Sequence, residues 1–398
     1  MKRGDSRLGP VRRGGDASFT KEVTAAGGIV ALKIAREGNC PWAALGHVPP
    51  GWPHLIPSRR ASLIARDVQE KSSLSSKGSD DSDRLIWLDG ELRPWADATV
   101  HVLSHAVQRG SLVFDYMSVH ELAAGNAVGL PAGPAVFRLA QHVERFFHSC
   151  ALMGLPVEPH GDAIAAAICE TIRANPGAKA VKISAYFASV EIDVVPADMH
   201  VTVAIAAYDP AADIQARLPV APPPKPQTVK LWIEKERANR REDIVSPQAK
   251  VSANYASPMT AKAQARADGF DEIVLVDEDG HLAEAPTSNL FFVHEGALVT
   301  PPDTKVLHGV TRSSVLEIAK AEGIEVHERA LPPEALLGAS EAFLTGTTAG
   351  VWPIESVDRQ PLSAGCPGPI SQALRDRFKR ASNGEEPEFA HWLTPAAG

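Results

Sequence analysis

A lysine, a glutamate and two threonines stand where expected strands or helices meet loops. Lys250 lies in PQAKVSANY, Glu284 in HLAEAPTSNLFFV, Thr311 in HGVTRSSV and Thr347 in LTGTTAG. The amine of a lysine can form a Schiff base with a carbonyl group and can then carry a proton between two carbon atoms. A buried carboxylate can keep a heteroaromatic nitrogen protonated, and a helix start offers amides to a phosphate. These groups together predict a site for a phosphorylated carbonyl cofactor.

Pyridoxal phosphate is the cofactor whose chemistry requires this combination. Its phenolate oxygen needs a donor, and Tyr255 stands five residues after Lys250. The stretch TRSSVLEIAKAEG is amphipathic, so the amides of Val310 and Thr311 would point from a helix N-terminus at the phosphate. The hydroxyl of Thr347, in the loop GTTAG, is a further candidate phosphate donor.

Several segments in order carry a resemblance to a known family. They are IWLDGELRPWADATVHVLSHAVQRGSLVFD, VFRLAQHVERFFHSCALMGLP, AKVSANY, EAPTSNLFFV, LVTPPDTKVLHGVTRSSVLEIAK and EAFLTGTTAGVWPI. From about Leu85 to about Ala381 the chain resembles the class IV, or fold type IV, aminotransferases, and most of all the branched-chain amino acid aminotransferases. The resemblance implies an α+β fold with a smaller N-terminal α+β domain and a larger C-terminal domain built on a mixed, barrel-like β core. It also implies that pyridoxal 5'-phosphate lies in the cleft between the domains.

The resemblance assigns a role to each matching residue. Lys250 would be the catalytic Schiff-base lysine, Glu284 the partner of the pyridine nitrogen and Tyr255 the partner of the phenolate oxygen. The phosphate would be held by Arg145, in HVERF, together with Val310, Thr311 and Thr347, and the substrate carboxylate by the amides of Thr348 and Ala349.

Each of these residue types also has an ordinary structural interpretation. A lysine is commonly a solvated surface charge, a glutamate after a hairpin can be an edge charge, and an arginine can lie on the solvent face of its helix. Tyr255 could be a core ring with a satisfied hydroxyl, and Thr347 could be only a turn residue. Thr311 could be a helix N-cap, which is compatible with phosphate binding.

The largest departures from the family pattern fall in the segment that shapes the substrate pocket. Branched-chain enzymes typically read like HYGTSVFEGIRAY there, whereas this chain reads QRGSLVFDYMSVH. Arg109 replaces a tyrosine, Asp115 a glutamate, Tyr116 a glycine and Ser118 an arginine. The form FDYMSVH is similar to the segment of relatives that act on D-amino acids or (R)-amines.

Three residues of this segment are candidate substrate contacts. Phe114 and Tyr116 alternate along an expected strand and would face the same side, as pocket walls or as core residues. Arg109 could bind a substrate carboxylate from its new place, or it could be a solvated charge at a helix end.

Composition is that of a globular protein with a substantial core, at 398 residues, 44% hydrophobic and 22% charged. The net charge of −8 argues against a nucleic-acid surface, and no apolar stretch is long enough to predict a membrane span. The cysteines Cys40, Cys150, Cys169 and Cys366 are widely spaced, so we expect reduced thiols, no metal site and a cytoplasmic protein.

The chain divides into segments of different character. Residues 1–83 have no counterpart in the family and end in KSSLSSKGSDDSD, which predicts a disordered extension, unless translation starts downstream. We then expect a small α+β domain at 84–217, a proline-rich linker at 218–227 and a large cofactor-binding domain at 228–385. Residues 386–398 are expected to form a C-terminal tail.

The expected activity is pyridoxal phosphate-dependent transamination. The donor would be an L-branched-chain or related amino acid and the acceptor 2-oxoglutarate, with ping-pong kinetics through Lys250. The family further implies a homodimer or higher homo-oligomer. The alternatives are transamination of a D-amino acid or (R)-amine, an aminodeoxychorismate lyase of the same fold, and a binding protein without catalysis.

Overall fold

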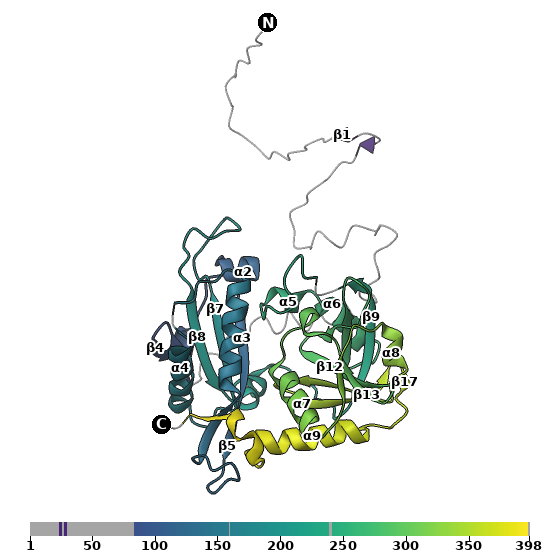
Figure 1. Ribbon diagram of the computed structural model, residues 1–398. Coiled ribbons are helices and arrows are strands. Elements are labelled where there is room, and N and C mark those ends of the chain that lie inside the picture. Colours follow the sequence, from purple (N-terminus) through teal and green to yellow (C-terminus); the bar gives the residue numbers. More distant parts are fainter. Residues whose placement is uncertain (1–23, 26–27, 30–82, 159, 239–240, 397–398) are drawn as a thin grey trace, which may run out of the picture. The chain divides into compact units, whose positions relative to one another are not determined.

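The computed structural model describes residues 24–25, 28–29, 83–158, 160–238 and 241–396, which fall into two units (Figure 1). In the first unit, β1 (Thr24–Ala25) pairs with β2 (Gly28–Ile29) as a short antiparallel ribbon. Nearly all of the extension expected at residues 1–83 lies outside the described residues. The second unit contains every other element named below.

The first large sheet has seven strands in the order β18-β6-β5-β7-β8-β3-β4, and all its neighbours are antiparallel. Its longest strand, β5 (Val113–Leu122), alternates buried and half-buried residues, which is the period-two pattern of a strand with one face on the core. The other strands are β3 (Leu85–Leu88), β4 (Glu91–Pro94), β6 (Gly133–Phe137), β7 (Ala180–Tyr186), β8 (Thr202–Tyr208) and β18 (Leu393–Pro395).

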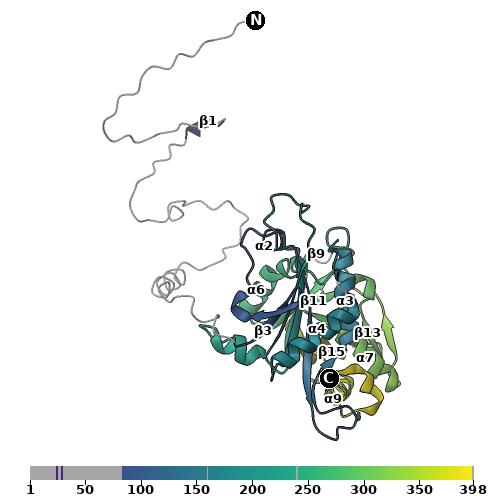
Figure 2. The ribbon, with the colours of Figure 1, turned by 90° about the vertical axis from the view of Figure 1, so that its left-hand side faces the viewer.

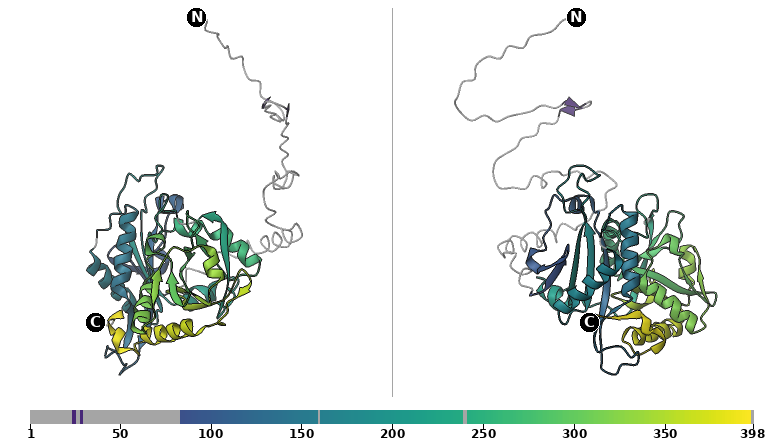
Figure 3. Two further views of the ribbon diagram at one scale, coloured as in Figure 1. Left: turned by 45° about the vertical axis from the view of Figure 1, so that its right-hand side comes forward. Right: turned by 60° about the vertical axis from the view of Figure 1, so that its left-hand side comes forward.

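Two long helices cover one face of this sheet, as Figures 2 and 3 show. Helix α3 (Leu139–Leu152) packs on β5, and α4 (Gly161–Ala174) packs on β8 and β3. Both helices are amphipathic, and their apolar stripes place Phe146 and Ile168 in a core shared with the sheet. The short helix α2 (His105–Arg109) precedes β5 and ends at Gly110, which has the positive φ of 66° that a left-handed C-cap requires.

The second large sheet has nine strands and is mixed. Strands β10-β9-β16-β15-β12-β13-β14 lie side by side in that order, with β11 paired to β12 and β17 to β16. The pairs β9–β10, β9–β16 and β13–β14 are parallel, and the remaining pairs are antiparallel. The strands are β9 (Val229–Ala238), β10 (Glu272–Val276), β11 (Glu284–Ala285), β12 (Ser288–His294), β13 (Ala297–Thr300), β14 (Val326–Glu328), β15 (Glu341–Gly346), β16 (Gly350–Val357) and β17 (Gln360–Pro361).

Helices surround this sheet. Helix α7 (Val310–Ala321) packs on β15, and α9 (Pro369–Ser382) contacts β15, β16 and α7. The core beneath them contains the stacked rings of Phe291 and Phe343. The other helices are α5 (Ala253–Ala256), α6 (Met259–Ala267) and α8 (Pro333–Leu337), and the short helical turns are η2 (Trp95–Asp97), η3 (Pro210–Ile214), η4 (Gln215–Arg217), η5 (Asp303–Lys305) and η6 (Pro387–Trp392).

The two sheets with their helices confirm the α+β class and the mixed core expected from the sequence. Residues 386–396, which we expected to belong to a C-terminal tail, instead form η6 and β18, and β18 pairs with β6 of the first sheet. The sequence did not reveal this because the strand is only three residues long and its register depends on a distant partner. No helix within the described ranges is long and apolar enough to cross a membrane.

Candidate active site

The site is assembled where the loop before α5 runs beside the start of β5. The backbone N–H of Phe114 donates to the carbonyl of Lys250 at 3.0 Å, and Ser252 N–H donates to the carbonyl of Leu112 at 2.8 Å. The N–H of Lys250 donates to Ser149 Oγ on α3 at 3.0 Å. Lys250 is therefore tied by its backbone to a strand and a helix of the first sheet, so the origin of its side chain is fixed.

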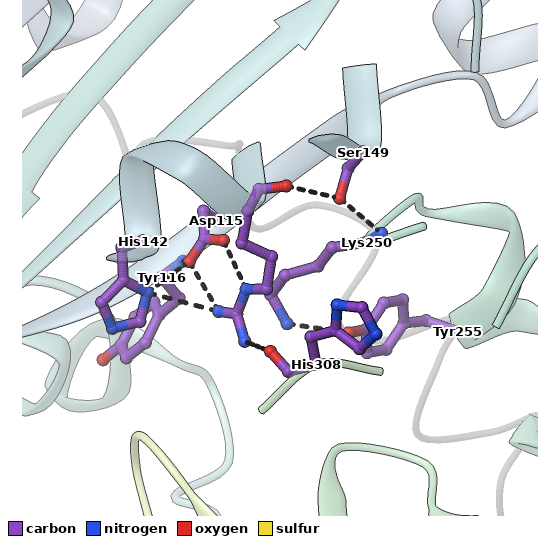
Figure 4. Close-up of polar contacts among 8 residues, drawn as sticks. Asp115, Tyr116, His142, Ser149, Lys250, Tyr255 and His308 are labelled. Carbon is purple, nitrogen blue, oxygen red and sulfur yellow. Dashed lines mark hydrogen bonds and ion pairs between the residues drawn. The ribbon is translucent and has the colours of Figure 1, made fainter. Parts of the chain in front are cut away.

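The side chain of Lys250 points at a phenol, as Figure 4 shows. Lys250 Nζ donates to the hydroxyl oxygen of Tyr255 on α5 at 2.9 Å. The Tyr255 ring packs on Phe114, with 5.1 Å between ring centroids. The lysine amine and the tyrosine hydroxyl, which the sequence placed in neighbouring roles, do lie together.

Glu284 is a buried carboxylate in the short strand β11, with 3% of its surface exposed. Its Oε2 accepts from Asn289 Nδ2 at 2.8 Å, and its Oε1 accepts from the N–H of Leu307 at 3.1 Å. Asn289 also donates to the carbonyl of Leu307 at 3.0 Å, which fixes the orientation of the amide. A carboxylate oriented in this way can hold a protonated ring nitrogen within the cavity that it lines.

Arg145 of α3 forms a bidentate ion pair with Asp115 of β5. Its Nε donates to Oδ2 and its Nη2 to Oδ1, both at 2.8 Å, while Nη1 donates to the carbonyl of His308 at 3.0 Å (Figure 4). A guanidinium has five N–H donors, so these three bonds leave donors for an anion. Arg145 lines the same cavity as Lys250 and Glu284, where the expected phosphate would lie.

Asp115 is fully buried beneath this arginine. Burial by itself would raise the pKa of Asp115, but the charge of Arg145 and the contact with His142 hold that pKa well below its usual range. Burial also lowers the pKa of His142, so we assign a neutral imidazole whose Nδ1–H donates to Asp115 Oδ1 at 2.7 Å. The N–H of Tyr116 is a further donor to Asp115, at 2.7 Å, and the carboxylate thus stays ionised.

The N-terminus of α7 supplies backbone donors at the opposite side of the cavity. The helix begins at Val310 after the N-cap Gly309, so the first N–H groups have no partner within the helix. A Cβ on Gly309 would lie 1.8 Å from Asn289 Oδ1, which explains why only glycine fits there. Thr311 is buried and lines the cavity together with Thr347, which lies in the turn after β15.

These groups form one inner cavity whose donor set matches pyridoxal phosphate. It offers an amine, a phenol, a buried carboxylate and, for a phosphate, a guanidinium, a helix start and hydroxyls. Thr345 Oγ1 is buried at this cavity without a hydrogen-bond partner within the described part of the chain. An unsatisfied buried hydroxyl is unfavourable, so a ligand oxygen beside it would supply the missing partner. The residues present therefore fit the cofactor.

An outer cavity of about 960 Å³ adjoins the inner one and shares Lys250, Tyr255 and Thr347 with it. Phe114 and Tyr116 line it from β5, as their alternation predicted. Its opposite wall includes Thr348 and Ala349.

Tyr116 reaches across this cavity. Its side chain is hydrogen-bonded to that of Thr348, and burial raises the pKa of Tyr116, so the phenol is neutral near pH 7. Tyr208 lies on the same wall, where burial first and Tyr116 second raise the pKa of Tyr208 to about 12.

Arg109 is not brought to either cavity within the described residues. It is the last residue of α2, is exposed, and donates from Nη2 to the carbonyl of Ile192 at 2.8 Å. This geometry agrees with the second of the two interpretations of Arg109, a solvated charge at a helix end. Ser118 is also outside the cavities, with its Oγ 2.9 Å from His120 Nε2.

Sequence reasoning missed several residues that support the site. Asn289 and Thr345 are partners across β12 and β15, and Ser149 lies one helical turn after Arg145. His142 was read only as a flanking helix residue, yet it contacts Asp115. Its spacing of three residues before Arg145 on one helix face was the available signal.

Comparisons with known proteins agree with this geometry. Residues 113–357 match the model of the family described as amino-transferase class IV. The chain is 30% identical over 315 residues to the branched-chain-amino-acid aminotransferase of Pseudomonas aeruginosa, covering 79% of this chain and 98% of that protein. It is 32% identical over 312 residues to the enzyme of the same name from Escherichia coli (strain K12), covering 77% and 96%.

A solved structure shows the same fold. The branched-chain aminotransferase from the thermophilic archaeon Thermoproteus uzoniensis, solved with norvaline, is 31% identical to this chain, with a TM-score of 0.69. The match covers 79% of this chain and 100% of that structure. Other solved branched-chain enzymes at 32% identity contain N-(5'-phosphopyridoxyl)-L-glutamate or pyridoxamine 5'-phosphate. The chain therefore belongs to the class IV aminotransferases, and it is an aminotransferase whose cofactor is pyridoxal 5'-phosphate.

Proposed function

We propose that this enzyme transfers the amino group of a branched-chain L-amino acid to 2-oxoglutarate in two half-reactions that use one site in turn. The names of the relatives from Pseudomonas aeruginosa and Escherichia coli support the donor class. The observation that carries the proposal is the position of Lys250, which lines both the inner and the outer cavity. A single amine at that junction can reach both the cofactor and the α-carbon of a substrate.

Bound pyridoxal phosphate withdraws electrons from the α-carbon of the donor and so makes its proton acidic. Lys250 is the residue that binds the cofactor covalently through a Schiff base in the resting enzyme. Its Nζ, once released, takes the α-proton and returns a proton on the same side. Tyr255 and Lys250 share a 2.9 Å hydrogen bond, so the phenol orients the amine for both tasks.

The remaining inner-cavity residues hold and orient the cofactor. Glu284 is assigned to the pyridine nitrogen because its carboxylate is buried and fixed by Asn289 and the Leu307 amide. Arg145, Val310, Thr311 and Thr347 are assigned to the phosphate. The α-carboxylate of the substrate is assigned to the amides of Thr348 and Ala349, with Phe114 and Tyr116 as pocket walls.

We also propose that the enzyme works as a homodimer in which Arg109 acts near the partner's site. The segments 100–107 and 190–195 lie together, because Ser104 bridges to Val190 and His105 Nε2 lies 2.8 Å from the Val194 carbonyl. Apolar side chains are exposed along both segments, including Val102 at 65% and Ile192 at 95%. A contiguous apolar surface of this kind favours burial against another protein. Sedimentation of the purified enzyme at micromolar concentration is expected to give a dimer, and a monomer would contradict this assignment.

The donor is tested by half-reactions followed through the absorbance of the cofactor. Purified holoenzyme is mixed with one donor at a time, and conversion to the pyridoxamine form is recorded. L-Leucine and L-glutamate are expected to convert the enzyme, whereas D-alanine and (R)-1-phenylethylamine are not. A release of pyruvate from aminodeoxychorismate without an acceptor would instead indicate a lyase.

A second candidate function is transamination of a D-amino acid or an (R)-amine. The observation that favours it is the contact of Tyr116 with Thr348, the residue assigned to the α-carboxylate. A ring at this position narrows the wall against which a substrate side chain or carboxylate would lie. Conversion by D-alanine or (R)-1-phenylethylamine with no conversion by L-leucine would favour this candidate over the first.

A further inference from the structure

The outer cavity contains a lysine that the roles above do not use. Lys182 of β7 is half-buried, lines this cavity and is the cross-strand partner of Tyr116. Its Nζ lies 4.6 Å from the ring centroid of Phe114, the ring that also lies 5.0 Å from Lys250 Nζ. The two ammonium groups therefore flank one aromatic wall of the cavity.

Lys182 has no carboxylate partner among the residues that the structure describes. Another lysine of the same cavity, Lys262, is paired with Glu272 at 2.5 Å. Burial first, and the charge of Lys250 second, lower the pKa of Lys182, because neither compensates its charge. The contact with the Phe114 ring supplies only part of what is lost on leaving water. A cation in such a place is stabilised when an anion enters the cavity.

The charges around the outer cavity have the same sign as Lys182. Its cationic lining residues are Lys182, Lys225, Lys250, Lys262 and Arg266, and its acidic ones are Asp271 and Glu272. The cavity is thus cationic although the whole chain has a net charge of −8. A concave surface of one sign raises the local concentration of a ligand of the opposite sign.

We propose that Lys182 binds the side-chain carboxylate of a dicarboxylic amino acid or 2-oxo acid in the outer cavity. This inference rests on the proposed function, because it takes the amides of Thr348 and Ala349 as the site of the α-carboxylate. A substrate with two carboxylates would then bridge two walls of the cavity, from β7 to the turn between β15 and β16. A monocarboxylic substrate such as leucine would leave Lys182 unpaired and would contact the rings of Phe114 and Tyr116 instead.

The first test measures binding without catalysis. Holoenzyme is titrated calorimetrically with glutarate, a dicarboxylate without an amino or keto group, and with 4-methylpentanoate, a monocarboxylate. The substitution Lys182→Met keeps the length of the side chain and removes its charge. We expect it to weaken glutarate about tenfold to hundredfold and to change 4-methylpentanoate by less than about threefold. The substitution Lys182→Arg should restore most of the glutarate affinity.

A matched control separates Lys182 from the general charge of the cavity. Lys225 is a second cavity lysine, with its Nζ 4.1 Å from the ring centroid of Trp352. Lys225→Met is expected to weaken glutarate by less than about threefold, because only a screened charge is lost. If the Lys182 and Lys225 variants weaken glutarate equally, the assignment to Lys182 is wrong.

The second test compares two donors in the half-reaction. Lys182→Met should lower kcat/KM for L-glutamate about tenfold or more and leave that for L-leucine within about threefold. An equal fall for both donors would overturn the inference, since it would mean a structural effect or a role at a shared group. If the unaltered holoenzyme converts neither donor, the proposed function fails, while the glutarate titration still decides the role of Lys182.

Discussion

Asp115→Asn is the substitution whose effect can be worked out most completely from the structure. The Asp115 carboxylate is fully buried and accepts from Arg145 twice at 2.8 Å, from His142 at 2.7 Å and from the N–H of Tyr116 at 2.7 Å. Asparagine keeps the shape but loses the charge, and its NH₂ group would face donors. Arg145, itself only 8% exposed, would be left as a buried charge without its counter-ion.

Removing one partner of a buried ion pair typically costs about 3–5 kcal/mol of unfolding free energy. We expect a loss in this range for Asp115→Asn, measured by urea denaturation of the cofactor-free enzyme followed by far-UV circular dichroism. The control is Glu91→Gln, which breaks the exposed pair of Glu91 and Arg93 and should cost less than about 1 kcal/mol. A loss for Asp115→Asn no larger than that of the control would refute the account of Arg145.

The pH dependence of this loss has a definite sign. The folded-state pKa of Asp115 lies below its ordinary value of 3.8, so its charge stabilises the fold above that value. This contribution falls as the pH drops below about 3.8 toward the folded-state pKa. The difference between the native enzyme and Asp115→Asn should therefore be constant between pH 5 and 8 and should shrink only in stronger acid.

Three further substitutions test other parts of the site. Glu284→Gln should retain bound cofactor yet slow the L-leucine half-reaction about 100-fold or more in stopped-flow absorbance, because the acid partner of the ring nitrogen loses its charge; an unchanged rate would show that Glu284 has another role. Thr345→Val removes a hydroxyl without a partner in the described structure, so the unfolding free energy of the cofactor-free enzyme should change by less than about 1 kcal/mol, while cofactor affinity falls about fivefold to tenfold in a fluorescence titration. Ser149→Ala deprives the Lys250 amide of its acceptor and should cost about 1–3 kcal/mol in denaturation, and a neutral result would mean that this hydrogen bond does not hold the lysine segment.

Local pattern was sufficient to predict the elements that carry the site. The alternation in VFDYMSVHEL predicted the strand that is β5, and the amphipathic stretch beginning at Thr311 predicted α7, which begins at Val310. The relative places of Lys250, Tyr255, Glu284 and Arg145 came from the family resemblance. The structure places all four around one cavity, but their roles toward the cofactor and substrate stay predictions.

Features that depend on long-range packing could not be predicted. Nothing near Asp115 in the sequence indicates that Arg145 and His142, on a helix after another strand, enclose it. Lys182 was hidden for the same reason, since its place in the cavity depends on the register of β7 against β5. The division at residues 218–227, the homodimer and the cytoplasmic location also stay predictions.

The central claim is that Lys250 is the amine that carries the cofactor. Holoenzyme is reduced with borohydride, digested, and analysed by mass spectrometry for the peptide that bears the phosphopyridoxyl group. The account predicts modification of Lys250 in the segment PQAKVSANY, with Lys182 unmodified. Modification of Lys182 or of another lysine, or holoenzyme that binds the cofactor without any reducible bond, would contradict it.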